Sequence, residues 1–349
     1  MHTMQRVLVV GGGVAGLTAA VNLAQRGHAV TLVEREASLG GNATTVCCKA
    51  IDGICQMCGA CLLADALDTA RNQAGLEVCT GTHLRQVSRA DGALAATLVS
   101  SNGPETLAFS ALVLATGFDH VDAHTKGPYG HGILPAVITG EEMERRLKAD
   151  GQGVYDDADL RRVAFVQCVG SRDEHVGRGY CSQVCCRYAL RLARMLKSRC
   201  PHIDITVFKM DIQASGRDFR TTWNAVTTEG IHIIAGLPAV VRRSPEHPLR
   251  AQFLYDDILA GQVGQDEFDL VVLSTGMQPR RDAETIAAQT GINRDRFGFF
   301  ATRDDSVSTI AGGVYVAGAC AAPRSIAESV AHAEVAAAAC HRYLQEKGA

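Results

Sequence analysis

Residues 6–17 read RVLVVGGGVAGL, and this stretch is the strongest indication of the fold class. Residues 6–10 are apolar after Arg6, a pattern that is typical of a buried parallel strand. Apolar side chains recur with helical spacing over residues 14–26, and a second strand pattern follows over residues 28–34. Together the three segments predict a strand–helix–strand unit, which is the start of a doubly wound α/β fold.

The glycines between the first strand and the helix have the spacing Gly11-x-Gly13-x-x-Gly16. The first glycine permits a tight turn, the second lets the backbone approach a pyrophosphate, and the third allows close helix–strand contact. The free N–H groups and dipole of the helix start also favour an anion. Glu34 ends the second strand, where a carboxylate can accept from ribose hydroxyls and would repel a 2′-phosphate. The sequence therefore predicts a dinucleotide site that disfavours NADP.

Size and charge limit the class of protein. The 349 residues, 47% of them hydrophobic, suffice for a full core and suggest two domains. A net charge of −3 gives no electrostatic footprint for nucleic acid or an anionic membrane. Glycines interrupt the apolar N-terminal stretch, which has no signal-peptide cleavage site, and no other apolar run approaches ~18 residues. We therefore expect a cytoplasmic protein with no membrane span and no nucleic-acid partner.

The rest of the chain alternates strand and helix patterns. We expect strands within residues 76–99 around an Asp91-Gly92 turn, strands over 111–115, 162–167, 204–209, 269–273 and 313–317, more sheet up to about residue 254, helices over 62–74, 185–199 and 325–344, and a solvated acidic turn at 156–159. This order extends the α/β fold over the whole chain.

Two of the expected strands end in Thr-Gly, at Thr116-Gly117 and at Thr275-Gly276. The repetition suggests that one nucleotide-binding fold is inserted into another. The predicted domains are a discontinuous domain over residues 1–140 and 280–349, and an inserted domain over residues 141–279.

Three further segments carry a resemblance to a known superfamily. They are Glu34-Arg35-x4-Gly40-Gly41-Asn42, Ala115-Thr116-Gly117 and Val314-Tyr-Val-Ala-Gly318. Across most of the chain they resemble pyridine nucleotide–disulfide oxidoreductases. The resemblance implies a thioredoxin-reductase-like architecture, with an FAD-binding Rossmann-type domain and an inserted second α/β nucleotide-binding-like domain. The FAD contacts that it implies fall on Gly11, Gly13, Val14, Ala15, Gly16, Glu34, Arg35, Gly40, Gly41, Asn42, Leu84, Thr116, Gly117, Gly318, Ala319 and Ile326.

The last of these segments departs from the superfamily. The usual pair is Gly-Asp, whose acid supports the ribityl chain and pyrophosphate, whereas this chain has Gly318-Ala319. Ser325 and Glu328 follow as a capping-box pattern, which predicts a helix start. Either that helix directs its dipole at the flavin pyrimidine edge, favouring negative charge there on reduction, or it is an ordinary capped helix of the core.

Cysteine is frequent, with 13 residues, of which nine fall in two groups. The first group is Cys47, Cys48, Cys55, Cys58 and Cys61, and the second group is Cys168, Cys181, Cys185 and Cys186. Clustered thiols in a reducing compartment more often serve metal or redox chemistry than structural bridges. Both groups are therefore candidate sites.

The second group occupies an informative place. It begins at the end of the strand expected to open the inserted domain, and no Gly-x-Gly-x-x-Gly occurs in residues 141–279. Four cysteines take the place of a glycine triplet: one at the strand end, one in the loop and two at a helix start. Four thiolates suffice for an iron–sulfur cubane, and a helix start favours thiolate over thiol.

This region also resembles the A-type component of heterodisulfide reductases. The resemblance rests on Cys168-Val-Gly-Ser-Arg-Asp, Tyr180-Cys-Ser-x-x-Cys-Cys186, Met210-Asp-Ile-x-Ala-x-Gly216 and Gly318-Ala-x-x-x-Pro-x-x-Ile326. It implies that Cys168, Cys181, Cys185 and Cys186 hold a [4Fe–4S] cluster near the flavin. It also implies an electron-transferring oxidoreductase subunit with B- and C-type partner subunits and a homodimeric state. The chain lacks the ferredoxin-domain insertions of the methanogen form, which disfavours electron bifurcation, and is similar to the short form in sulfur-oxidiser complexes.

The first group leaves three interpretations open. The spacing Cys55-x2-Cys58-x2-Cys61 suits a second cluster with Cys47 or Cys48, although no Cys-Pro follows. The Cys55-Gln-Met-Cys58 pair also suits a redox or free-thiol loop at a partner interface, and an incidental loop is the third interpretation. Two rival functions are an NAD(P)H-dependent disulfide reductase that uses Cys55 and Cys58, and a non-catalytic FAD-binding assembly subunit.

Overall fold

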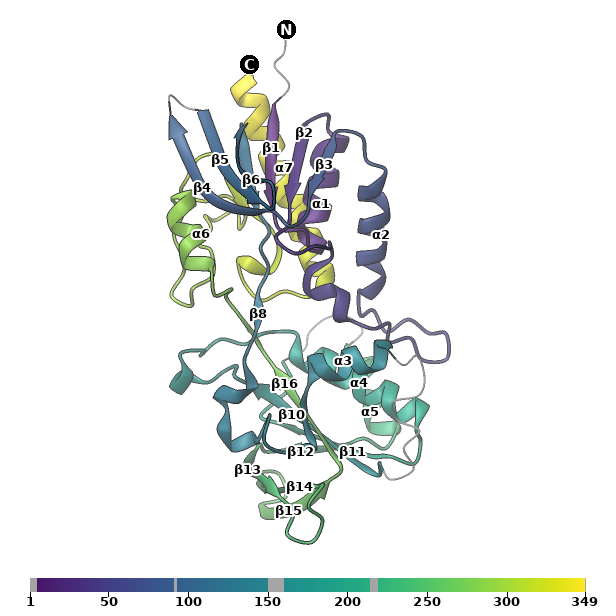
Figure 1. Cartoon of the computed structure of the whole chain (residues 1–349). Helices are drawn as coiled ribbons and strands as arrows, with labels where there is room; N and C mark the ends of the chain where they lie inside the picture. The colour runs from purple at the N-terminus through teal and green to yellow at the C-terminus, as the bar shows by residue number, and fades with distance from the viewer. Residues whose placement is uncertain (1–4, 91–92, 150–159, 214–218, 349) are drawn as a thin grey trace. The chain divides into compact units, whose positions relative to one another are not determined.

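The computed structural model describes residues 5–90, 93–149, 160–213 and 219–348 (Figure 1). The Asp91-Gly92 turn, the acidic turn at 156–159, and Ala214 and Gly216 of the Met210 motif lie outside the described residues. The chain divides into two compact units. The outer unit comprises the residues up to Thr44, Gly59–Asp119 and the residues from Gln278 onward, and the inserted unit comprises Thr45–Cys58 and His120–Met277.

A parallel sheet with strand order β18-β7-β1-β2-β3 forms the centre of the outer unit. Its elements are β1 (Arg6–Val10), α1 (Val14–Gln25), β2 (Ala29–Val33), η1 (Gly41–Thr45), α2 (Ala60–Arg71), β3 (Leu76–Cys79), β4 (His83–Ala90), β5 (Ala93–Ser100), β6 (Gly103–Phe109), β7 (Ala111–Leu114), α6 (Ala283–Thr290), β18 (Val314–Val316), η5 (Gly318–Cys320) and α7 (Ile326–Gly348). Val7 and Val9 of β1 pack in one core with α1 and α7, whereas Leu8 and Val10 pack in another with β4–β6 and α6. Successive strand residues point to opposite faces, so the apolar run Val7–Val10 of β1 packs on both faces of the sheet, and both faces are covered.

The inserted unit repeats this arrangement with strand order β12-β11-β10-β16-β9. Its elements are η2 (Ala123–Thr125), η3 (Gly127–Tyr129), β9 (Val137–Thr139), α3 (Gly140–Ala149), β10 (Arg162–Val169), η4 (Glu174–Val176), α4 (Cys185–Arg199), β11 (Asp204–Lys209), α5 (Phe219–Thr228), β12 (His232–Ala235), β13 (Pro238–Arg243), β14 (Ala251–Asp257), β15 (Gln262–Phe268) and β16 (Leu270–Thr275), and the short strands β8 (Asp119–His120) and β17 (Met277–Gln278) pair where the chain passes between the units. Val163 and Phe165 of β10 pack against α4, and Ala164 and Val166 pack with the aromatic core beneath β13–β15. Each parallel sheet is thus covered by helices on one face and by an antiparallel sheet on the other, where α6 also packs in the outer unit.

The structure corrects several sequence expectations. The stretch from residue 209 to 254 was expected to be sheet, but Phe219–Thr228 form α5. Its Thr-rich sequence has low intrinsic helix propensity, and burial of Val226 in the core of the inserted unit overrides that preference. Helices α3 and α6 and strand β6 were also not predicted.

The division into units also differs from the predicted boundaries. Residues 120–140 belong to the inserted unit, because β9 pairs with β16 at the edge of its sheet. Residues 45–58 belong to it as well, because Cys47 and Ile51 pack in the core that contains α4. These contacts are distant in sequence and leave no local pattern.

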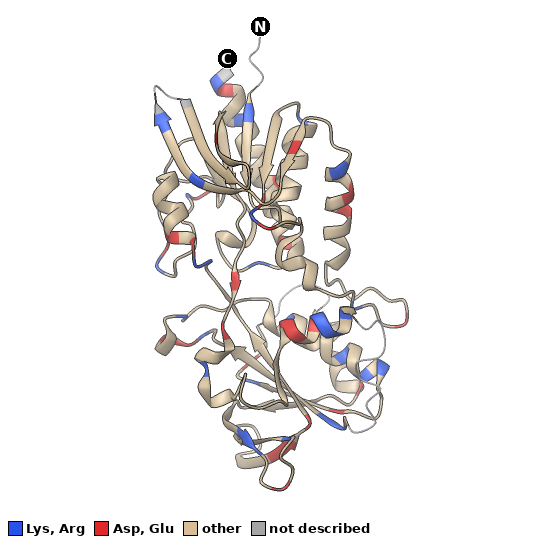
Figure 2. Cartoon of the chain, viewed as in Figure 1, with Lys and Arg blue, Asp and Glu red and all other residues tan. Residues whose placement is uncertain are grey.

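Charged residues are interspersed along both units, and the central strands carry few of them (Figure 2). Within the described residues, no helix is both long enough and apolar enough to cross a membrane.

Candidate functional site

At two glycines of the first turn, a side chain would collide with the protein's own backbone. Gly11 has φ +110°, and a β-carbon there would lie 2.4 Å from the Ala115 carbonyl oxygen. A β-carbon on Gly16 would lie 1.8 Å from the carbonyl oxygen of Gly11. Both contacts are with backbone, so the strand–turn–helix packing itself excludes any side chain at these positions.

Gly13 differs from its two neighbours. It has extended backbone angles at the N-terminus of α1, and a β-carbon there would approach no atom closer than the 4.0 Å distance to Gly41 Cα. Nothing in the described part of the chain therefore requires glycine at this position. The open space lies where free N–H groups of α1 begin, which suits a bound pyrophosphate.

Glu34 is held beside this turn. Its Oε2 accepts the Gly12 N–H at 2.6 Å, and its Oε1 accepts the Glu36 N–H at 2.9 Å. The side chain is 9% exposed. Each carboxylate oxygen keeps a further acceptor site, so the group is oriented and still able to accept from ribose hydroxyls.

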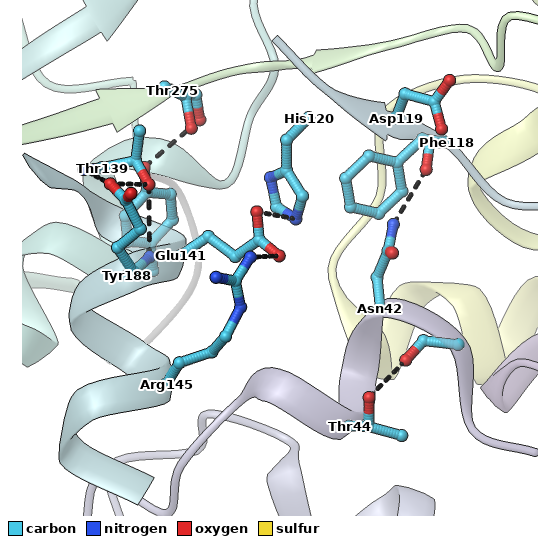
Figure 3. Close-up of polar contacts among 12 residues, drawn as sticks. Asn42, Thr44, Phe118, Asp119, His120, Thr139, Glu141, Arg145, Tyr188 and Thr275 are labelled. Atoms are coloured by element: carbon cyan, nitrogen blue, oxygen red, sulfur yellow. Dashed lines mark hydrogen bonds and ion pairs between the residues drawn. The ribbon is translucent and has the colours of Figure 1, made fainter. Parts of the chain in front are cut away.

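The Gly40-Gly41 segment adjoins the same turn. The Gly40 N–H donates to the Gly12 carbonyl at 2.8 Å, and Gly13 and Gly40 form a parallel bridge. Asn42 Nδ2 donates to the Phe118 carbonyl at 2.8 Å, just after Thr116-Gly117 (Figure 3). Thr116 Oγ1 is buried and has no hydrogen-bond partner within the described chain. A buried hydroxyl of this kind suits a ligand partner.

The last predicted contacts lie where η5 meets α1 and α7. Gly318 has φ +76°, and a β-carbon there would lie 2.6 Å from the Ala15 β-carbon in the first turn of α1, next to Val14. Ala319 is buried in η5, and Ile326 is the first residue of α7. The structure therefore brings most of the predicted set together within the outer unit.

Two members of the predicted set are placed differently. Arg35 is engaged in a 3.0 Å ion pair with Asp282. The Leu84 side chain is buried in the core between β1 and β4, so only its main chain remains available to a ligand.

The helix start at α7 has the predicted capping box. The Ser325 N–H donates to Glu328 Oε2 at 2.8 Å, and the Glu328 N–H donates to Ser325 Oγ at 3.3 Å. Sequence reasoning missed His332, whose Nδ1 accepts the Gly318 N–H at 2.9 Å and whose Nε2 lies 2.7 Å from the Ser306 carbonyl. This pairing requires a neutral imidazole, and burial lowers the pKa of His332 accordingly.

The Gly13→Ala variant tests whether glycine at position 13 is needed for FAD binding and not for folding. Without FAD we expect a free energy of unfolding within about 1 kcal/mol of wild type, because the backbone angles suit alanine and the space is open. With FAD we expect about 30-fold weaker binding, near 2 kcal/mol, because the methyl group takes the space of the pyrophosphate. Flavin titration of the deflavinated protein measures this effect. Gly312→Ala, at an open position without positive φ, is the control. Equal FAD affinities for the two variants would refute the placement of the pyrophosphate at Gly13.

The four cysteines of the second group come together in the inserted unit. Cys168 is the second-to-last residue of β10 and has φ +59°, a strained angle for a residue with a side chain. Cys185 and Cys186 are the first residues of α4. Cys185 forms hydrogen bonds with Cys168 and Cys186, and Cys181 interacts electrostatically with the same two sulfurs. The predicted set is therefore one cluster of thiols where a dinucleotide fold places its phosphate turn.

Hydrogen bonding within the cluster gives the thiols different pKa values. Hydrogen bonding with Cys168 and Cys186, together with burial, raises the pKa of Cys185 well above its usual range. Accepting from Cys185 lowers the pKa of Cys168, and it lowers that of Cys186 to about 7, although burial opposes both shifts. Burial raises the pKa of Cys181.

Several further donors surround these sulfurs. Arg172 donates to Cys168 and is held by Asp211 through two contacts. The Gln183 N–H donates to Cys181 Sγ at 3.3 Å, and the Gln213 N–H donates to Cys186. Arg172 and Asp211 fall inside the quoted motifs, but nothing in their local sequence shows that they meet.

The residue types of this set are those that iron–sulfur clusters use, but the described structure does not group their sulfurs at metal-ligand spacing. Thiolate sulfur is the ligand such clusters use, and N–H and guanidinium donors to the sulfurs stabilise their negative charge. Gln167, next to Cys168, is fully buried and its side-chain amide has no partner in the described chain. Among the described residues, no three His, Cys, Asp or Glu side chains are grouped so that they could hold a metal ion.

The first cysteine group lies mainly in the loop Thr45–Cys58. Cys47 is buried, and burial together with the nearby Glu144 carboxylate raises the pKa of its thiol to about 12. Lys49 is 1% exposed and its Nζ lies 2.5 Å from Glu144 Oε1 and 3.1 Å from the Cys47 carbonyl. Cys55 is exposed and Cys58 is partly exposed, and the described cysteines are all free thiols.

The fold and the glycine turn define a dinucleotide-binding α/β protein with two repeated units. The model of the pyridine nucleotide-disulphide oxidoreductase family matches residues 5–339, and the chain belongs to this family. The predicted superfamily and the assignment as an oxidoreductase are thereby confirmed, and the family supports FAD as a cofactor.

Curated relatives are more specific. An iron-sulfur component of type A from the CoB–CoM heterodisulfide reductase of Methanopyrus kandleri is 31% identical, over 95% of this chain and 63% of the relative. The type A component of the H(2):CoB-CoM heterodisulfide,ferredoxin reductase of Methanothermobacter marburgensis is 37% identical, over 65% of this chain and 36% of the relative. The predicted resemblance to the A-type component of heterodisulfide reductases is confirmed. The chain spans less than two thirds of the length of these relatives.

Solved structures agree on the fold. Thioredoxin reductase of T. acidophilum superposes with a TM-score of 0.64 at 17% identity, covering 98% of this chain and 99% of that one. Thioredoxin reductase of Lactococcus lactis gives 0.63, also at 17% identity, with coverage of 98% and 99%. The thioredoxin-reductase-like fold class is therefore confirmed.

Proposed function

We propose that this chain is an electron-transfer subunit that carries FAD and a [4Fe–4S] cluster in a heterodisulfide reductase-like complex. The observation that carries the proposal is the gathering of Cys168, Cys181, Cys185 and Cys186 at the end of β10 and the start of α4. The proposed context is cytoplasmic sulfur oxidation, with B- and C-type subunits as partners and a homodimer of this chain. The curated relatives support the type of complex.

The outer unit would hold FAD by its dinucleotide end. The N–H groups at the start of α1 and the open space at Gly13 suit the pyrophosphate, and Glu34 suits the adenosine ribose. Bound FAD would supply two-electron chemistry that can be divided into single steps. The chain positions the cofactor and excludes a 2′-phosphate at the ribose.

The inserted unit would hold the cluster through its four thiolates, which supply one-electron chemistry once iron is bound. Arg172 places a positive charge at Cys168, and Asp211 fixes the guanidinium. The Gln183 and Gln213 N–H groups donate to two other sulfurs. All of these contacts would favour the more negative, reduced state of a bound cluster and so would raise its reduction potential.

The rival functions require different features. An NAD(P)H-dependent disulfide reductase needs a second phosphate-binding turn, but β10 runs into Cys168-Val-Gly-Ser171 and no glycine triplet follows. A non-catalytic assembly subunit has no use for four gathered thiols. The thiol cluster therefore favours electron transfer over both.

Anaerobic reduction of the purified chain tests the function. We expect stoichiometric NADH and NADPH to leave the flavin oxidised, and dithionite to reduce both the flavin and a separate iron–sulfur centre seen by EPR. Rapid bleaching by NADH in iron-free protein would establish the disulfide reductase instead. Flavin that stays oxidised with every donor would establish the assembly subunit.

A further inference from the structure

His332 of α7 is a buried histidine, and both of its ring nitrogens contact the backbone of the outer unit. Nε2 lies 2.7 Å from the Ser306 carbonyl oxygen, which can only accept, so Nε2 carries the proton. Nδ1 is then the acceptor for the Gly318 N–H at 2.9 Å. The two contacts therefore fix one neutral tautomer of the ring.

The backbone on both sides of the ring has an unusual conformation. Ser306 has φ +64°, a left-handed angle that residues with side chains seldom adopt. Such a residue persists only where its surroundings hold it, and its carbonyl is directed at His332. The Gly318 carbonyl also accepts from Arg324 Nη1 at 3.1 Å. Side chains therefore hold both polar groups of Gly318.

Gly318 links this hydrogen bond to the predicted FAD contacts. Its α-carbon packs against the first turn of α1, where an added β-carbon would lie 2.6 Å from that of Ala15. The N–H groups of that turn suit the pyrophosphate, and Ala319, the next predicted contact, follows directly. The close contact with α1 blocks movement of Gly318 toward the helix, and the bond to His332 opposes movement away from it.

Protonation of the ring would remove this bond. A histidinium carries a proton on each nitrogen, so its Nδ1–H would confront the Gly318 N–H, while its Nε2–H would still donate to Ser306. Burial lowers the pKa of His332, the Ser306 carbonyl opposes this shift, and the positive charge of Arg324 adds to it. The ring is therefore neutral at neutral pH and gains its second proton only below about pH 6.5.

No buried carboxylate faces the ring from the described elements around it. Neither α1 nor β7 has a titratable side chain. The other titratable residues on this part of α7, the loop around Ser306, η5, β18 and α2 are Glu328, Glu334, Arg303, Asp304, Asp305, Cys320, Tyr315, Cys61, Asp65, Asp68 and Arg71. The carboxylates among them are all exposed. Glu328 is occupied by the capping box, and Asp305 accepts the Val307 and Ser308 N–H groups. An imidazolium at this position would therefore lack a counter-charge.

We infer that His332 is a positioning residue for FAD: its neutral ring holds Gly318 and Ala319 in the conformation that accepts the cofactor, and protonation of the ring weakens FAD binding. The sign follows from linkage, because a ligand that prefers the neutral ring loses affinity as the pH falls and the ring becomes charged. The inference rests on the FAD site of the proposed function and not on the cluster.

Titration of the deflavinated full chain with FAD at several pH values tests this inference. We expect wild type to bind FAD about tenfold more weakly at about pH 5 than at about pH 8. In His332→Asn the amide oxygen is bonded to Cγ, as Nδ1 is in histidine, and it does not titrate in this range. This variant should stay within about threefold of wild type at about pH 8 and should change less than about twofold with pH.

Two further variants complete the comparison. His332→Leu has no acceptor and leaves the Gly318 N–H without a partner, so it should bind FAD about tenfold more weakly at both pH values. His341→Asn is the matched control, because His341 is a partly buried histidine of the same helix whose Nδ1 pairs with His28 Nε2 at 2.8 Å. We expect it to keep the pH dependence of wild type.

The comparison of wild type with His332→Asn decides the outcome, even if His332→Leu does not fold. Wild-type affinity that does not change with pH, or that falls equally in His332→Asn, would overturn the inference. Loss of the pH dependence in His341→Asn would overturn it as well. Wild type that binds no FAD at any pH would overturn the proposed function and the inference with it, so the two failures are distinguishable.

Discussion

Cys185→Ala, purified without oxygen, is expected to lose nearly all of its iron and to keep its FAD. Cys185 is 1% exposed at the start of α4 and forms hydrogen bonds with two of the other thiols. Its removal leaves three ligands for a cluster that requires four. Iron and flavin per chain, measured by absorption and metal analysis, should fall from about four irons to well below one, with flavin unchanged.

Cys200→Ala is the matched control for this variant. Cys200 is also a buried cysteine, at the C-terminal end of the same helix, and is not part of the cluster. We expect its substitution to leave the iron content unchanged, whatever its effect on stability. Equal iron in Cys185→Ala and wild type would remove Cys185 from the ligand set.

Lys49→Met is expected to lower the free energy of unfolding by about 3–5 kcal/mol. Lys49 and Glu144 are 1% and 6% exposed, and the lysine is the only cation at hydrogen-bond distance from that carboxylate among the contacts of the described chain. Methionine fills the same volume but leaves the Glu144 carboxylate buried without a counter-charge, which is the costly way to break such a pair. Urea unfolding at neutral pH measures the change.

Two further variants isolate the cause. Lys49→Met/Glu144→Gln removes both charges and keeps an acceptor for the Cys47 N–H, so it should recover most of the lost stability. Arg145→Met, on the same helix α3, breaks the more exposed pair with Glu141 and should cost less than about 1 kcal/mol. If Lys49→Met were no worse than Arg145→Met, the buried pair would not anchor the loop.

The elements that the sequence predicted best are those with a local signal. Residues 6–34 form the expected strand, turn, helix and strand, because apolar periodicity and the glycine spacing are properties of neighbouring residues. Helix α4 spans the expected residues 185–199 for the same reason. The four cysteines of the second group also lie close together, because a strand end and the following helix start adjoin in a doubly wound fold.

What the sequence did not predict depends on contacts distant along the chain. The Lys49–Glu144 pair joins residues 95 positions apart, and the Arg172–Asp211 pair joins residues 39 positions apart. Helix α5 is held by burial of Val226 and not by its own propensity. The membership of residues 45–58 in the inserted unit has the same origin, because it follows from packing against that unit's core.

In the dinucleotide site too, the residues with a local sequence signal were predicted and those without one were not. The sequence predicted Gly11, Gly13, Gly16 and Glu34, whose spacing is local to one strand–helix–strand unit. It did not predict His332, because an imidazole that accepts from Gly318 has no signature in its neighbours along α7.

The most direct measurement is the iron and acid-labile sulfide content of the wild-type chain purified without oxygen, followed by EPR after reduction. We predict about four irons and four sulfides per chain, with the spectrum of one reduced [4Fe–4S] centre. Oxygen-protected protein that binds FAD but contains neither iron nor sulfide would contradict the assignment of the four thiols.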